Sequence, residues 1–278
     1  VTVSFTVDGV DCFGGNDGQI TAAGAGGTGT MTYAWSNGGS TATITGLTAA
    51  TYTVTATDAN GCTATNQTTI NAATAITIVT STDTVSCFGG NDGAATATAS
   101  GGSGTFTYTW NAGSGATISG LTAGTYTVTA TDGNGCTATT TATVIQPASS
   151  VSVTATGTGP GCFGGSNGTA TGTGSGGTGT ITYVWNAGTG ATISGLTAGT
   201  YTVTATDANG CTATDDVTIT APNQLFAFTS VVDQPTCNTS ADGEIQAFGF
   251  QGTPNYTYAW SNGGTTQSIT GLTAGTYT

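Results

Sequence analysis

Short runs in which apolar and polar residues alternate recur along the whole chain, separated by Gly, Asn and Asp. In Thr51–Thr57, for example, Tyr52, Val54 and Ala56 alternate with threonines that must face the other way. No segment shows the 3.6-residue apolar period of an amphipathic helix. Alternation with a period of two is typical of half-buried strands, so the pattern predicts an all-β protein.

The pattern repeats with a period of 75 residues. Four Trp residues and four early Cys residues both follow this step, at Trp35, Trp110, Trp185 and Trp260 and at Cys12, Cys87, Cys162 and Cys237. A fixed step without insertions indicates tandem copies of one structural unit. We expect four domains, at residues 1–73, 74–147, 148–222 and a truncated 223–278.

One strand run of each copy carries the large side chains. Met31, Tyr33 and Trp35 share a face, and the other copies place aromatic or large apolar residues at the same positions. This register predicts that Trp35, Trp110, Trp185 and Trp260 lie in the core, although the same stripe could instead be an exposed platform for sugars. Six or seven short strands with a strand-borne Trp near a disulfide favour immunoglobulin-like β-sandwiches. Very short linkers between copies favour stacking as a rod.

A second Cys series gives each complete copy one late cysteine, 49 or 50 residues after the early one. Pairing within each copy is the natural interpretation, and one such bridge would stabilise a small unit by about 4 kcal/mol. The fourth copy ends at Thr278 before a late Cys appears, which would leave Cys237 unpaired. The expected disulfides are Cys12–Cys62, Cys87–Cys136 and Cys162–Cys211. Disulfides place the chain outside the cytoplasm.

The composition excludes most catalytic and nucleic-acid-binding chemistry. The chain has no Lys, Arg or His, and 13 Asp plus Glu give it a net charge of −13. It therefore lacks an imidazole base, a Schiff-base amine and any basic patch for a phosphate backbone. No apolar run is long enough to cross a membrane as a helix. We expect a protein that is not an enzyme, needs no cofactor, and neither binds nucleic acid nor inserts into a membrane.

Each complete copy has an Asp-x-Asn-Gly segment just before its late cysteine. This segment resembles the opening of a calcium loop, but no acidic residue follows at the required distance. Because Asn-Gly is a strong turn motif, a hairpin turn is the preferred interpretation and no metal site is expected. The weak calcium candidates are Asp58, Asn60, Asp132, Asn134, Asp207 and Asn209.

The fourth copy has two Phe residues where the others have small or polar residues. Phe248 and Phe250 fall on the opposite face of their strand from Ile245 and Ala247. Two exposed Phe side chains would form a contact patch for a partner or a neighbouring domain, and a local repacking of the core is the alternative.

Taken together, several blocks of the second copy resemble the SprB-type repeat of large Bacteroidota cell-surface gliding adhesins. They are Cys-Phe-Gly-Gly-Asn-Asp-Gly at 87–93, Tyr-Thr-Trp at 108–110, Gly-Leu-Thr-Ala-Gly-Thr-Tyr-Thr-Val at 120–128, and Asp-Gly-Asn-Gly-Cys at 132–136. The resemblance extends over all four copies, but the fourth replaces Phe-Gly-Gly with Asn238–Ser240. It implies long proteins exported by type IX secretion, displayed on the cell surface as filaments, and used in adhesion and gliding. Asp83-Thr84-Val85 also resembles a Bacteroidota O-glycosylation pattern, which makes Thr84 a candidate glycan acceptor.

These observations favour a structural or adhesive repeat region of a long extracellular surface protein. Its expected partners are neighbouring repeats of the same chain, other copies in a filament, and a surface polysaccharide or solid surface. One alternative is a filament subunit that assembles through domain ends or strand exchange. A second alternative is an array of carbohydrate-binding modules, which would require exposed Trp residues.

Overall fold

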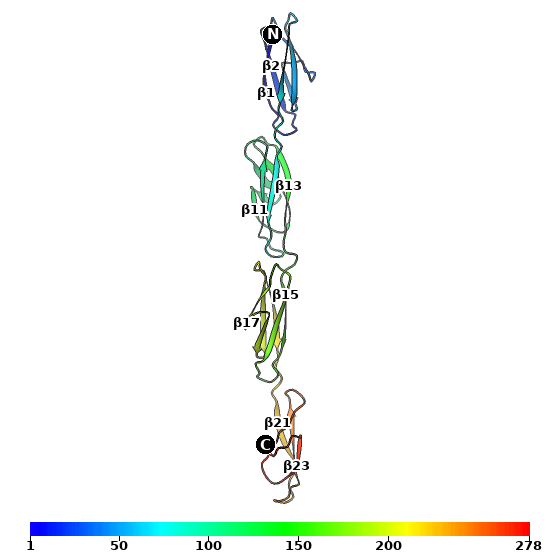
Figure 1. Cartoon of the computed structure of the whole chain (residues 1–278), viewed down its shortest axis with the longest axis vertical. Helices are drawn as coiled ribbons and strands as arrows, with labels where there is room; N and C mark the ends of the chain where they lie inside the picture. Colours follow the sequence, from blue (N-terminus) through cyan, green and yellow to red (C-terminus); the bar gives the residue numbers. More distant parts are fainter. The chain divides into compact units, whose positions relative to one another are not determined.

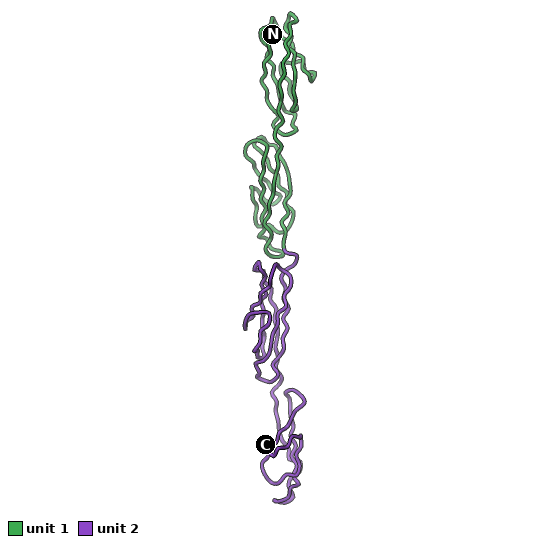
Figure 2. The backbone as a smooth tube through the Cα atoms, in the orientation of Figure 1, with its two compact units in different colours: residues 1–146 green, residues 147–278 purple.

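The computed structural model describes residues 1–278, which form two compact units, Val1–Gln146 and Pro147–Thr278 (Figure 2). All regular structure is β-strand, and no helix is present that could span a membrane (Figure 1). No strand crosses the expected boundaries after residues 73, 147 and 222. The fourfold division itself remains a prediction, and we refer to its segments as repeats 1 to 4.

Repeat 1 contains two antiparallel three-stranded sheets, with strand orders β1-β2-β4 and β3-β5-β6. Lettered in chain order with D omitted, these are sheets A-B-E and C-F-G, which is the strand order of an immunoglobulin-like sandwich. The expected fold is therefore confirmed. The strands are β1 (Thr2–Asp8), β2 (Gly18–Ala25), β3 (Thr32–Trp35), β4 (Thr43–Leu47), β5 (Ala50–Thr57) and β6 (Thr63–Ile70).

Repeat 2 has the same topology with one two-residue strand added at the edge of the second sheet. Its sheets have the orders β7-β8-β11 and β10-β9-β12-β13. The strands are β7 (Thr77–Asp83), β8 (Gly93–Ser100), β9 (Thr107–Trp110), β10 (Gly113–Ser114), β11 (Thr117–Leu121), β12 (Gly124–Thr131) and β13 (Thr137–Val144).

The second unit contains a complete sandwich followed by a partial one. The complete sandwich has the sheets β14-β15-β18 and β17-β16-β19-β20, and the partial one has the single sheet β21-β22-β23. The strands are β14 (Ser152–Thr158), β15 (Gly168–Ser175), β16 (Thr182–Trp185), β17 (Gly188–Thr189), β18 (Thr192–Leu196), β19 (Gly199–Thr206), β20 (Thr212–Ile219), β21 (Phe226–Asp233), β22 (Gly243–Phe250) and β23 (Ser268–Leu272).

Each repeat has its own core, organised around its Trp. Trp35 packs with Ile20, Ile44 and Val54, which are all buried, and the ring of Phe5 lies 6.0 Å from the Trp35 ring. The Trp35 Nε1–H donates to the carbonyl oxygen of Thr41 at 2.9 Å, so its one polar atom is satisfied. The four Trp side chains are only 4–7% exposed. Sugar stacking on these rings is therefore impossible, and the carbohydrate-binding alternative fails.

In every repeat, a hydrogen bond from a Tyr side chain closes the segment that follows the last strand of the first sheet. The Tyr52 hydroxyl, near the start of β5, donates to the Thr48 carbonyl oxygen at 2.9 Å. This is the tyrosine corner of immunoglobulin-like folds. The same bond recurs at Tyr126, Tyr201 and Tyr277, each to the carbonyl oxygen of the Thr four residues earlier.

Candidate functional site

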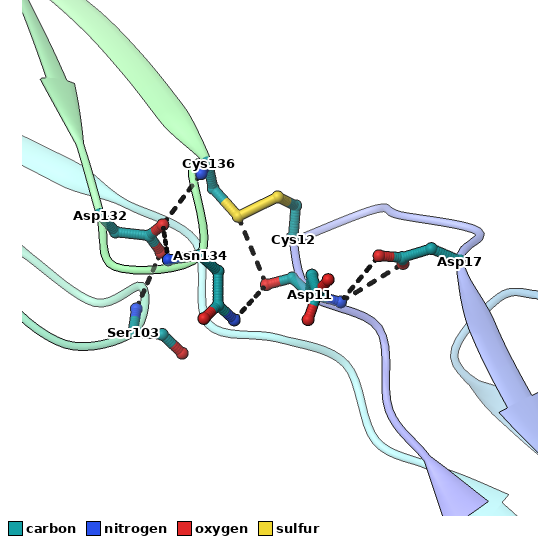
Figure 3. The surroundings of a disulfide bond; sticks show 7 residues. All are labelled: Asp11, Cys12, Asp17, Ser103, Asp132, Asn134 and Cys136. Atoms are coloured by element: carbon teal, nitrogen blue, oxygen red, sulfur yellow. Dashed lines mark hydrogen bonds between the residues drawn. A yellow bond between two sulfur atoms is a disulfide. The ribbon is translucent and has the colours of Figure 1, made fainter.

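The first unit contains a disulfide that joins two repeats. Cys12, in the loop after β1, is bonded to Cys136, which directly precedes β13, and their Cα atoms are 5.6 Å apart (Figure 3). The expected pairs Cys12–Cys62 and Cys87–Cys136 are therefore wrong. Cys162 is exposed and free, so the expected Cys162–Cys211 pair is wrong as well. Cys87 and Cys211 are disulfide-bonded, whereas Cys62 and Cys237 are free and exposed.

The direction of the strands explains why pairing within one repeat fails. In repeat 2, Thr80 and Thr82 of β7 donate side-chain hydrogen bonds to the carbonyl oxygens of Thr141 and Thr143 of β13, so these strands run parallel. Cys136, which directly precedes β13, therefore lies beside the start of β7. Cys87 follows the end of β7, so it lies at the opposite end of the sandwich. Seven residues of strand span roughly 23 Å. The Cα atoms of a disulfide must lie within about 7 Å of each other.

A buried carboxylate shapes the turn that presents each late cysteine. Oδ1 of Asp132 accepts hydrogen bonds from the backbone N–H groups of Asn134 and Cys136, at 3.0 and 2.9 Å. Its Oδ2 accepts from the backbone N–H of Ser103 at 2.8 Å, which ties two turns together (Figure 3). Gly135 has a φ of 84°, a conformation that favours Gly. The sequence motif that resembled a calcium loop is thus a turn whose carboxylate binds backbone N–H groups.

The same contacts recur around Asp58 and Asp207, and all three carboxylates are only 5–7% exposed. Burial raises the pKa of Asp132, but hydrogen bonds from the backbone N–H groups of Ser103, Cys136 and Asn134 outweigh this effect and hold the pKa below its ordinary value of 3.8. The pKa of Asp207 is lowered by the same balance. Hydrogen bonds from the backbone N–H groups of Thr28 and Cys62 lower the pKa of Asp58. No cluster of three or more His, Cys, Asp or Glu side chains that could hold a metal ion is present.

The early cysteine lies in a tight loop with its own carboxylate. The Gly15 N–H donates to the Cys12 carbonyl oxygen at 2.9 Å, and the Asp11 N–H donates to both carboxylate oxygens of Asp17 at 3.3 Å. Across the junction, Asn134 Nδ2 donates to the carbonyl oxygen of Asp11 at 3.5 Å (Figure 3). The Asp17 carboxylate raises the pKa of Asp11.

Phe248 and Phe250 form an aromatic surface with two Phe residues of the neighbouring strand. Phe228 is paired with Phe248 and Phe226 with Phe250, and the Phe228 and Phe248 rings stack at 5.0 Å. Phe226, Phe228 and Phe250 are 53–62% exposed, and Phe248 is half-buried. We call these four residues the Phe patch.

A slip of one residue in strand register produces the Phe patch. In repeat 1, Val3 is paired with Gly24. The 75-residue step would therefore pair Phe228 with Gly249, but Phe228 is paired with Phe248, and an irregularity between Val231 and Asp233 separates the two registers. A slip of one residue moves every side chain to the other face. Phe228, which takes the place of the half-buried Val3, is therefore turned outward.

Two further features of the sequence bear on the candidate residues. Thr84 is exposed in the segment after β7, so its hydroxyl is accessible, and glycosylation there remains a prediction.

The sequence analysis did not predict the tyrosine corner. The spacing of Thr48 and Tyr52, which recurs in all four repeats, could have indicated it.

Comparison with solved structures finds distant likenesses to multidomain proteins. They include Sidekick-1 immunoglobulin domains 1-5 (12% identity, TM-score 0.32, 80% of this chain and 59% of that one). A second is extracellular domains 3-5 of Drosophila OTK (10% identity, TM-score 0.30, 75% of this chain and 92% of that one). A third is domains 7, 8 and 9 of the S-layer protein SbsC (16% identity, TM-score 0.25, 68% of this chain and 79% of that one). The chain thus spans about three fifths of the Sidekick-1 fragment. TM-scores this low carry no inference, so the fold rests on the strand order described above.

No curated protein sequence matches this chain. The model of the SprB repeat family matches it at three places, residues 4–40, 79–115 and 229–265. Each match begins in the first strand of a repeat, contains its early cysteine and continues beyond its Trp. These three matches support SprB-type repeats at these places in the chain.

Proposed function

We propose that this chain is part of the repeat region of a long extracellular surface protein, in which it has a structural, non-enzymatic role and extends an adhesive surface from the cell. The observation that carries this proposal is the disulfide between Cys12 and Cys136, because it fixes one repeat to the next. A bond between repeats serves a protein that must stay extended outside the cell, where disulfides persist. Adhesion during gliding, after export by type IX secretion, is the role that the SprB-type repeat supports.

The surface role can be tested on cells that carry the protein. Antibodies raised against the oxidised 278-residue chain should label intact, unpermeabilised cells, and deleting the repeats in frame should reduce attachment to glass and polysaccharide-coated surfaces. Antibodies against a cytoplasmic protein serve as the control for membrane integrity. Labelling that appears only after permeabilisation would contradict the proposal.

A further inference from the structure

The turn that presents Cys62 has the same structure as the turn that presents Cys136. Asp58 Oδ1 accepts from the backbone N–H groups of Asn60 and Cys62 at 2.9 and 2.8 Å, as Asp132 Oδ1 does from Asn134 and Cys136. The Asp58 N–H donates to the Cys62 carbonyl oxygen at 3.0 Å, and the corresponding bond closes the Asp132 turn at the same distance. Cys136 is bonded to the early cysteine of another repeat, whereas Cys62 is exposed and free.

The loop of Cys237 has the same hydrogen bonds as the loop of Cys12, although its sequence differs. The N–H three residues after the cysteine donates to the cysteine carbonyl oxygen in both loops, from Ser240 at 3.0 Å and from Gly15 at 2.9 Å. The residue before the cysteine donates its N–H to an Asp five residues after that cysteine, from Thr236 to Asp242 at 3.1 Å and from Asp11 to Asp17 at 3.3 Å. The Cys162 loop has the corresponding bonds, from Gly165 at 3.0 Å and from Gly161 to Asn167 at 3.2 Å, and Cys162 and Cys237 are both exposed and free.

We propose that Cys62, Cys162 and Cys237 are unfilled halves of the inter-repeat disulfide site, and that each takes the complementary cysteine of another SprB-type repeat. The Cys62 turn accepts an early-cysteine loop, and the Cys162 and Cys237 loops each bind a late-cysteine turn. The evidence is the bond between Cys12 and Cys136, because those residues are the repeat equivalents of Cys237 and Cys62. A second copy of this chain carries both complementary halves.

The chemistry balances with a small disulfide as oxidant. A Cys62 thiolate attacks glutathione disulfide to form a mixed disulfide and release one glutathione thiolate. The thiolate of Cys237 from a second copy then attacks the Cys62 sulfur of the mixed disulfide and releases the second glutathione. One S–S bond is formed between the copies, one is broken in the oxidant, and two thiols of the protein are oxidised. Because the two kinds of half-site are different surfaces, the contact is heterologous and each product still has free half-sites of both kinds.

The test uses the oxidised chain as purified, so that the existing disulfides stay intact, with glutathione disulfide as the added oxidant. Non-reducing electrophoresis should show a ladder of covalent oligomers that reducing agent abolishes. Peptic peptides of the ladder should contain Cys62 joined to Cys162 or to Cys237; pepsin is suitable because the chain has no Lys or Arg for trypsin. All three cysteines are exposed, so the Ser variants should fold normally.

Two variants separate this site from random thiol oxidation. Cys62→Ser removes the late half, and Cys162→Ser combined with Cys237→Ser removes both free early halves, so neither variant should form a ladder, whereas mixing the two should restore species that join Cys62 to Cys162 or Cys237. Cys237→Ser alone is the matched control, because Cys162 still offers an early half, and it should keep the ladder. The proposal is overturned if the wild-type chain stays monomeric, if Cys62→Ser still forms a ladder, or if Cys237→Ser loses it.

Discussion

At the scale of single residues, one carboxylate per complete repeat holds the turn that presents the junction cysteine. Asp132 receives three backbone N–H groups from two segments, and Asp58 and Asp207 repeat the arrangement. A buried carboxylate is tolerated here because N–H donors replace the water that it loses. The position therefore requires an ionised Asp, and its protonation state should be coupled to stability.

We expect acid to destabilise the protein through these carboxylates. The folded-state pKa of Asp58, Asp132 and Asp207 lies below the ordinary value of 3.8, so below that value the unfolded chain binds more protons than the folded one. Their contribution is fully present above pH 3.8 and is lost as the pH falls through the folded values. Calorimetry from neutral to acidic pH should show a melting temperature that decreases below that point.

The variant Asp132→Asn should have a lower melting temperature at neutral pH and a smaller decrease in acid. Asp83→Asn, at an exposed position, is the control and should follow the wild-type curve. An Asp132→Asn protein that loses as much stability in acid as the wild type would show that other groups cause the acid sensitivity.

Removing the hydroxyl of Tyr52 tests the tyrosine corner. Tyr52→Phe keeps the buried ring and deletes the bond to the Thr48 carbonyl oxygen, so the free energy of unfolding should fall by about 1 kcal/mol. Urea denaturation followed by fluorescence would measure the change. Tyr258→Phe, which removes a hydroxyl outside any corner, is the comparison, and equal losses in both variants would argue against a special role for the corner.

At the scale of the strand, repeat 4 shows that register can override a repeated sequence pattern. The pairing of Phe226 with Phe250 and of Phe228 with Phe248 brings four aromatic rings together on one face. Cross-strand aromatic pairs each contribute roughly 0.2–1 kcal/mol. We infer that this gain holds β21 in its shifted register.

Replacing the two Phe residues of β22 should therefore restore the ordinary register. Phe248→Thr combined with Phe250→Ser reproduces the residues of repeats 2 and 3 at these positions, and Phe228 should then lie opposite Gly249. Nuclear Overhauser contacts between the strands would report the pairing. The control is Phe88→Ser, an exposed Phe in a loop of repeat 2, which should leave β21 unchanged. If the double variant kept the present slipped register, the irregularity at Val232 alone would set it.

Much of the fold followed from the sequence, because the alternating pattern and the 75-residue step both reflect burial within one repeat. The faces of Trp35 and Tyr52 were predictable for this reason. The partner of Cys12 was not, because a spacing of 50 residues says nothing about which end of a sandwich each cysteine occupies. That required the parallel direction of β7 and β13. The register slip in repeat 4 could not be predicted either, because the 75-residue period implies the same strand pairing in every repeat.

At the scale of the whole molecule, the disulfide between Cys12 and Cys136 couples two repeats that would otherwise unfold separately. Closing a loop with a sequence separation of 124 residues stabilises the folded state by about 5 kcal/mol in the chain-entropy model. Cys12→Ser should accordingly lower the urea midpoint of the first two repeats. Cys62→Ser should have no effect, because Cys62 is free. If the two variants unfolded at the same midpoint, the bond would have no role in stability.

The same bond decides which residues can carry tension. In a chain pulled from Val1 and Gln146, force runs along β1 to Cys12, crosses directly to Cys136 and leaves through β13, so residues 13–135 lie outside the covalent load path. Even if both repeats unfolded completely, residues 13–135 could not add their extended length to the first unit until the disulfide was reduced. The unit therefore behaves as a tether of nearly fixed length, and redox chemistry controls how far it can extend.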